Sequence, residues 1–130
     1  MSNIRGIRGA TTVSRNKKEE ILTSSMTLLE KIVSANKIKI EDIASVIFSV
    51  TKDINAEFPA IAARRLGWLY TPLLCTYEIS VPGSLKKCIR VLIHVNSDKK
   101  QAQMKHIYLG KAKKLRPDIG SREKDRYYFS

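Results

Sequence analysis

The feature of this sequence that most constrains its fold is a cation inside an apolar strand. Residues 88–95, CIRVLIHV, carry apolar side chains on both parities, which is typical of a strand buried on both faces of a sheet. Arg90 lies in the middle of this run. Because a buried charge without a partner is strongly destabilising, the sequence predicts that an anionic group faces Arg90.

The rest of the chain predicts one long helix and several further strands. Apolar residues from Ile21 to Val33 recur at helical spacing and predict a helix over residues 17–36. Asn16, followed three residues later by Glu19, resembles a capping box at its start. The other expected elements are strands at 3–13, 44–50 and 71–80, a short helix between Phe58-Pro59 and Gly67, a turn at 81–84, and a short strand within 106–115.

These elements indicate an α+β fold, with a mixed β-sheet packed on one long helix, because no βαβ unit repeats along the chain. One helix leaves the other face of the sheet bare, so we expect an oligomer that covers it. The length of 130 residues suits one domain, expected over residues 1–118. Residues 119–130 are expected to form a polar tail that is mobile when nothing is bound.

The net charge of +12, from 24 Lys and Arg against 12 Asp and Glu, indicates an anionic partner. Nucleic acid and a small dianion both fit this charge. The lysines are scattered in ones and twos, without the glycine and aromatic pattern of RNA-stacking strands. Most of them are therefore interpreted as a solvated surface, and no nucleic-acid partner is expected.

The cysteine content and hydropathy give further expectations. Cys75 and Cys88 make neither a disulfide framework nor a zinc-site spacing, so we expect reduced thiols, a cytoplasmic location and no metal. No run approaches the roughly 18 apolar residues of a membrane span, and no membrane partner is expected.

The residues that could carry chemistry are mainly arginines. There is no G-x-S-x-G or Walker loop, and His94 and His106 are interpreted as structural. Arginines in apolar or turn contexts suit a ligand with several carboxylates, because the guanidinium grips a carboxylate through two donors. They are Arg5, Arg8, Arg64, Arg65, Arg90 and Arg116. Structural salt bridges to Glu57, Glu78 or Asp118 are an equally good explanation for any one of them; Glu78 in particular is a plausible partner of Arg90.

Several motifs, in order along the chain, resemble the monofunctional chorismate mutases of the AroH type. They are IRGIRGATTV at 4–13, FPA at 58–60, PLLC with Glu78 at 72–78, VPGSLKKCIRVL at 81–92, and H-x-Y-L followed by LRPD between 106 and 118. The resemblance implies a homotrimer forming a pseudo-α/β-barrel, with active sites between subunits. It also implies the Claisen rearrangement of chorismate to prephenate, in tyrosine and phenylalanine biosynthesis, without a cofactor, metal or covalent intermediate.

The resemblance also implies roles for individual residues. Arg90 matches the arginine that donates to the ether oxygen of the substrate, and Arg8 matches an arginine that binds a carboxylate. Glu78 and the Cys75 main chain match the groups that hold the ring hydroxyl. The remaining expected binding residues are Tyr108, which hydrogen-bonds nearby, the neighbours Leu73 and Leu74, the apolar walls Phe58 and Leu115, and the cations Arg64 and Arg116.

The spacing of two site residues, and two positions that differ from the family pattern, refine these expectations. Cys75 and Glu78 are three apart, so their side chains should point to opposite faces of a strand, and Cys75 should contribute mainly its backbone. Cys88 is interpreted as a packed thiol. Ile61 and Leu74 stand where many members have a lysine and a threonine, which predicts retained activity with weaker binding. A basic RNA-binding module and a non-catalytic small-molecule-binding trimer of the same fold remain as alternatives.

Overall fold

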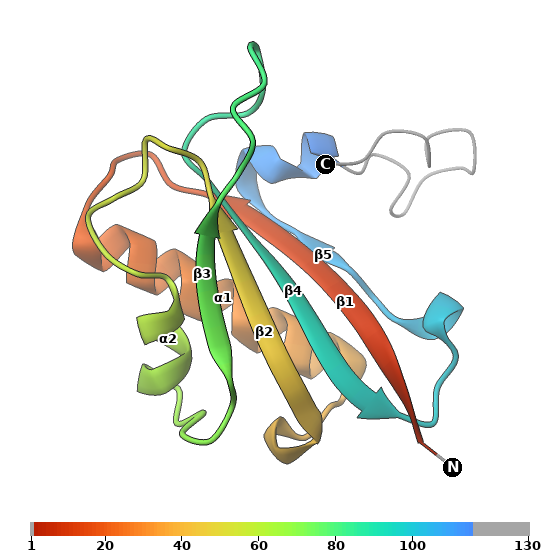
Figure 1. Ribbon diagram of the computed structural model, residues 1–130. Coiled ribbons are helices and arrows are strands. Elements are labelled where there is room, and N and C mark those ends of the chain that lie inside the picture. Colours follow the sequence, from red (N-terminus) through yellow and green to blue (C-terminus); the bar gives the residue numbers. More distant parts are fainter. Residues whose placement is uncertain (1, 116–130) are drawn as a thin grey trace.

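The computed structural model describes residues 2–115, which form a two-layer α+β structure (Figure 1). Five strands form one sheet in the order β3-β2-β4-β1-β5. The pairs β1–β4 and β2–β4 are antiparallel, whereas β2–β3 and β1–β5 are parallel. The predicted mixed sheet is therefore confirmed. The strands are β1 (Asn3–Thr12), β2 (Ile43–Val50), β3 (Leu73–Tyr77), β4 (Cys88–Ser97) and β5 (Ile107–Tyr108).

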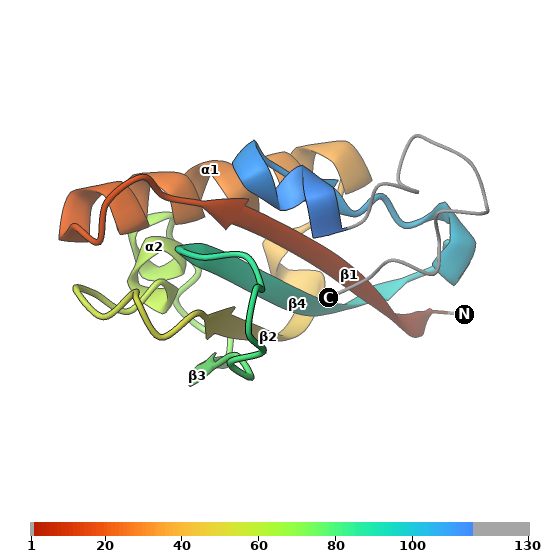
Figure 2. The same cartoon turned by 90° about the horizontal axis from the view of Figure 1, so that it is seen from above.

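Helix α1 (Lys18–Asn36) lies along one face of the sheet, as the apolar period predicts (Figure 2). Its fully buried residues, such as Leu28 and Ile32, share one core with Ile7, Phe48 and Ile93 of the strands and with the short helix α2 (Ala60–Arg65). α2 ends before Gly67, whose φ of 90° favours glycine, as predicted. We refer to the sheet surface under α1 and α2 as the helix face.

Gly9 explains how closely β1 approaches α1. A Cβ at this position would lie 2.8 Å from Ile32 Cδ1 and 3.2 Å from Leu28 Cδ1. The close backbone approach predicted for the glycines of the first strand is confirmed here, because only a residue without a side chain leaves room for the two helix residues.

Strand β4 corrects the expectation that both of its faces are covered. Ile89, Val91, Ile93 and Val95 are at most 3% exposed and lie on the helix face. Arg90, Leu92 and His94 alternate with them and are half-buried on the opposite face, called the open face below. Among the described residues no α-helix packs there; the 3-10 helix η3 (Gly110–Leu115) covers one end of it, near Ala10. The apolar residues on both parities predicted two covered faces, which is wrong for a single chain.

The start of α1 corrects a second expectation. The predicted capping box of Asn16 and Glu19 is wrong, because the side-chain oxygen Oδ1 of Asn16 instead accepts the backbone N–H groups of Asn55 and Ala56, each at 3.0 Å. The Glu20 carboxylate folds back and accepts the backbone N–H and the hydroxyl of Ser14, both at 2.5 Å. A carboxylate close to the helix N-terminus is favourable, so Glu20 anchors the segment that enters α1.

The remaining segments differ from expectation mainly in length. β3 is shorter than the expected 71–80, because Pro72 and the turn-forming residues after Glu78 lie outside the ladder. The turn at 81–84 is confirmed by the hydrogen bond from Ser84 N–H to the Val81 carbonyl. Short 3-10 helices occupy Ile40–Asp42 and Gln101–Gln103. The expected tail at 119–130 lies outside the described residues, and within residues 2–115 no helix is long and apolar enough to cross a membrane.

Candidate active site

Arg90 lies near the middle of the open face, opposite Ser49 of β2 and Ala10 of β1. Its Nη1 is 3.4 Å from Oε1 of Glu78, and the two side chains are 14% and 23% exposed. The predicted partnership of Glu78 with Arg90 is therefore confirmed. A pair this far from solvent interacts more strongly than one on the surface, where screening weakens it.

Glu78 leaves the Arg90 guanidinium incompletely used. Arginine has five N–H donors in a fixed plane. The Nε of Arg90 is buried and has no hydrogen-bond partner among residues 2–115. Buried donors are nearly always paired in folded proteins, so an unused one beside a carboxylate indicates room for another acceptor. The neighbouring Cys88 thiol is only a weak hydrogen-bond acceptor. Burial raises the pKa of this thiol, although Arg90 lowers it, and the thiol stays neutral.

Glu78 reaches Arg90 because it follows the last residue of β3. Its backbone N–H donates to the Val50 carbonyl at 2.9 Å, which continues the strand direction by one residue. The Cys75 side chain packs into the core of the helix face, near Ala60, and burial raises the pKa of its thiol. Cys75 and Glu78 thus point to opposite faces, as their spacing predicts, and only the Cys75 backbone is available on the open face.

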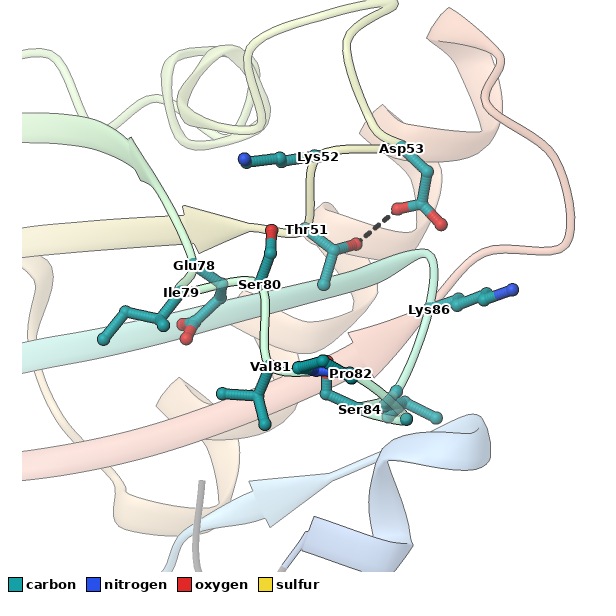
Figure 3. A pocket seen from close by; sticks show the side chains of 12 residues that line it. Thr51, Lys52, Asp53, Glu78, Ile79, Ser80, Val81, Pro82, Ser84 and Lys86 are labelled. Carbon is teal, nitrogen blue, oxygen red and sulfur yellow. Dashed lines mark hydrogen bonds between the residues drawn. The ribbon is translucent and has the colours of Figure 1, made fainter.

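A pocket of about 420 Å³ begins at Glu78 and continues under the loop that joins β3 to β4. Figure 3 shows Glu78 at one side of it and Lys86 at the other, with Thr51 and Asp53 on a separate loop. The Asp53 carboxylate accepts the backbone N–H of Lys87, and the Thr51 hydroxyl accepts that of Cys88. These two side chains fix the point at which β4 starts, two residues before Arg90.

Tyr108 and Leu115 lie together at the end of the open face that η3 covers. Tyr108 pairs with Ala10 in the sheet, and Ala10 pairs with Arg90, so the tyrosine lies two strands away in the same row. It is 9% exposed and packs with Ala10, Cys88 and Ala112, against which Leu115 of η3 also packs. The apolar wall predicted for Leu115 therefore lies beside Tyr108, at the covered end of the open face.

Arg8 joins the same face from β1. It pairs with Leu92, two residues from Arg90 along β4, and is half-buried. Its backbone N–H donates to Nδ1 of His106 at 2.9 Å, across 98 residues of sequence. Four strands or strand ends thus bring four predicted site residues to one sheet face: Arg8, Glu78, Arg90 and Tyr108.

The structure does not bring every predicted residue to this place. Phe58, Leu73, Leu74 and Arg64 line a second pocket of about 400 Å³, between α2 and β3, which shares no lining residue with the pocket at Glu78. Phe58 and Leu74 are 65% and 60% exposed. Arg64 folds back to donate to the Trp68 carbonyl and, at 3.2 Å, to that of Leu69. Arg116 lies outside the described residues.

Thr51, Asp53 and His106 were not predicted as parts of the site. Thr51 and Asp53 follow a strand in a polar turn, so no local pattern links them to a segment more than thirty residues away. His106 precedes Tyr108 by two residues, and this place in the H-x-Y motif was the available signal. Among the described residues, no group of three or more His, Cys, Asp or Glu side chains is placed to hold a metal ion.

Two arginines, a glutamate and a tyrosine on one open sheet face define a small α+β protein with a site suited to a ligand that carries several carboxylates. Comparison with known proteins makes this specific. The family model described as chorismate mutase type I matches residues 4–119. The chain belongs to the type I chorismate mutase family, so the resemblance found in its motifs is confirmed.

Relatives agree over most of their length. Chorismate mutase AroH of Bacillus subtilis (strain 168) is 52% identical over 117 residues, which are 89% of this chain and 92% of the relative. Chorismate mutase AroH of Thermus thermophilus is 47% identical over 119 residues, 91% and 98% of the two chains. The solved structure of a chorismate mutase from Clostridium thermocellum superposes with a TM-score of 0.82 at 55% identity, covering 83% of this chain and 96% of that one.

Proposed function

We propose that this protein is a chorismate mutase, an isomerase that rearranges chorismate to prephenate on the route to tyrosine and phenylalanine. The family match, the two relatives and the solved structure all carry this activity in their names. They favour it over an RNA-binding module and over a non-catalytic trimer. The observation on the molecule that carries the proposal is Arg90, which pairs with Glu78 and whose buried Nε has no hydrogen-bond partner among residues 2–115.

The reaction needs no nucleophile, which agrees with the side chains gathered on the open face. A carbon–oxygen bond of the ether breaks while a carbon–carbon bond forms, and the electrons move in one cycle without an added proton. An enzyme accelerates such a step by holding the substrate in its compact, reactive conformation and by stabilising the charge that separates in the transition state. Fixed, partly desolvated donors perform the second task at no cost of reorganisation.

Arg90 is the donor for the ether oxygen. Negative charge grows on that oxygen as the bond breaks, so a hydrogen bond from the guanidinium is stronger in the transition state than in the ground state. Glu78 orients Arg90 and accepts the ring hydroxyl of the substrate. Arg8 and Tyr108 hold a carboxylate through contacts made equally before and during the reaction, so they contribute to substrate binding.

We also propose a homotrimer with active sites between subunits. The open face and the adjoining edge leave large apolar side chains in solvent, including Ile4 at 60% and Leu74 at 60% exposed, and such surfaces favour association. A neighbouring copy would bring Phe58, Leu73, Leu74 and Arg64 to the site around Arg90. This arrangement accounts for the two separate pockets of a single chain.

The remaining proposals concern the surroundings of the protein. The net charge of +12 would raise the local concentration of a dianion such as chorismate. The two cysteines are free thiols, which supports the proposed cytoplasmic location, since thiols persist in a reducing compartment. We propose residues 1–118 as the catalytic domain, followed by a tail.

The test is the conversion of chorismate by purified protein, followed as loss of substrate and formation of prephenate. Arg90→Ala should lower kcat by at least about 10²- to 10³-fold, the usual cost of one donor aimed at a developing oxyanion. Arg90→Lys should also be strongly impaired, because an ammonium lacks the two-donor geometry. Sedimentation equilibrium of the same samples tests the trimer.

Arg65→Ala is the matched control. Arg65 is 43% exposed and pairs with Glu19 on the surface, at 3.4 Å, so its loss should leave turnover near that of the wild type. Turnover of Arg90→Ala close to the wild-type value would refute the role of Arg90. A folded wild type that does not convert chorismate would refute the activity itself.

A further inference from the structure

Within residues 2–115, the outer edge of β1 is covered largely by side chains rather than by a full strand. β5 pairs with this edge only at Gly9 and Ala10. Nearer the N-terminus, the segment that joins β4 to β5 runs beside β1, as Figure 1 shows, and supplies hydrogen bonds from two side chains. An unpaired strand edge otherwise leaves its N–H and C=O groups to water or to another chain.

The first of these side chains is Gln101, which acts as a substitute for a strand residue. Its Oε1 accepts the Gly6 N–H at 2.8 Å, and its Nε2 donates to the Gly6 carbonyl at 2.6 Å. Both polar groups of one backbone residue are satisfied, but Gly6 carries no side chain. The contact stabilises the edge without orienting any group on the open face.

The second side chain is that of His106, which hydrogen-bonds to the backbone of Arg8, a predicted site residue. Its Nδ1 accepts the backbone N–H of Arg8 at 2.9 Å, in a partly buried position. Acceptance at Nδ1 requires a neutral imidazole with its proton on Nε2, because both nitrogens of an imidazolium are donors. The hydrogen bond therefore specifies one form of the ring and fixes the backbone from which the Arg8 side chain extends.

The same histidine also sets the position of a second binding residue. His106 directly precedes β5, so a hydrogen bond from Arg8 to its ring holds β5 against β1 at the point where Tyr108 pairs with Ala10. Arg8 and Tyr108 are the two groups assigned above to the substrate carboxylate. A shift of either backbone is amplified at the end of a long side chain, where the hydrogen bond to the ligand is made.

We propose that His106 is a positioning residue for chorismate binding, which acts through the Arg8 backbone and does not touch the substrate. The inference rests on the proposed function of the site. Because Arg8 and Tyr108 bind a carboxylate equally in the ground state and the transition state, losing their alignment weakens substrate binding rather than the chemical step. Loss of the His106 hydrogen bond should therefore raise KM and leave kcat nearly unchanged.

The test compares variants that differ only in the acceptor. His106→Leu removes it, and KM should rise about tenfold, the upper value for one neutral hydrogen bond, while kcat stays within about twofold. His106→Asn places a carbonyl oxygen near the former Nδ1 and should restore most of the affinity. His106→Gln places its oxygen near the former Nε2 and should not.

Gln101→Leu is the control for a purely structural role. It removes two hydrogen bonds from the same edge and should lower the melting temperature at least as much as His106→Leu, with KM unchanged. An equal rise of KM in Gln101→Leu, or no rescue by Asn relative to Gln, would overturn the inference. The Asn and Gln pair decides the question if the leucine variant does not fold.

The wild-type assay separates this inference from the proposed function. If the wild type converts chorismate and Arg90→Ala does not, but His106→Leu keeps the wild-type KM, then the role of His106 alone is refuted. If the folded wild type does not convert chorismate, the proposed function fails and the role of His106 in binding fails with it.

Discussion

The two faces of the sheet differ although the same strands form both. On the helix face, Ile7, Phe48 and Ile93 are fully buried and pack against α1. On the open face, the neighbouring positions hold Arg8 and Arg90, which are half-buried. Side chains alternate along a strand, so a shift of one residue exchanges a stabilising position for a functional one.

The difference shows why this fold tolerates a cation in a central strand. An ion pair buried on all sides must overcome a large desolvation cost. Arg90 and Glu78 retain 14% and 23% exposure, so only part of this cost applies to them. The site therefore lies where charged side chains are partly desolvated. Their electrostatic interactions with a substrate are stronger there than in water, and their burial is still compatible with folding.

The largest expected contrast is between Ile93 and Arg90, on opposite faces of one strand. Ile93→Ala should lower the free energy of unfolding by about 2–5 kcal/mol, since it leaves a cavity in a closed core. Its kcat should stay near the wild-type value at temperatures where it is folded. Arg90→Ala should instead lower kcat strongly and change the free energy of unfolding little. Urea unfolding and turnover of both variants check this, and loss of kcat in fully folded Ile93→Ala would break the division between the faces.

A smaller effect is expected at Glu78. Glu78→Gln keeps the shape of the side chain but removes the charge that faces Arg90 at 3.4 Å. The value of kcat/KM should fall about 10- to 100-fold, which corresponds to one hydrogen bond to a charged group. Steady-state kinetics measure it, with the exposed Glu19→Gln as a control that should remain active. An unchanged kcat/KM in Glu78→Gln would show that the Glu78 carboxylate has no role in the site.

The smallest effect concerns Glu20, which is not part of the site around Arg8 and Arg90. The Ser14 hydroxyl and backbone N–H lower the pKa of its carboxyl from the usual 4.5 to about 2. The charged form is thus favoured by folding, so its contribution is present above pH 4.5 and is lost as the pH falls through about 2. The melting temperature of Glu20→Gln should lie below that of the wild type at neutral pH.

The measurement is thermal unfolding of wild type and Glu20→Gln between pH 7 and pH 2. Their difference should be constant down to about pH 5 and shrink towards pH 2, because the Glu20 carboxylate becomes protonated first in the unfolded and then in the folded protein. Glu19→Gln, at an exposed position next to it in sequence, is the matched control for the removal of one surface carboxylate. A difference that persists at pH 2 would mean that Glu20 acts through packing rather than through charge.

The sequence by itself determined the features that depend on neighbouring residues and on motifs. The period of α1, the turn at 81–84 and the strand around Arg90 are local patterns. The motifs also identified the family, and with it four residues that the structure brings to one face: Arg8, Glu78, Arg90 and Tyr108.

Only the tertiary structure decided the relations between distant segments. It showed that β4 is covered on one face, that Asn16 binds residues near Asn55 instead of capping α1, and that Phe58 and Arg64 lie away from Arg90 in a single chain. It also joined His106 to the Arg8 backbone across 98 residues. Such contacts depend on how the elements pack and on which strand lies beside which, and a local pattern along the chain does not encode that arrangement.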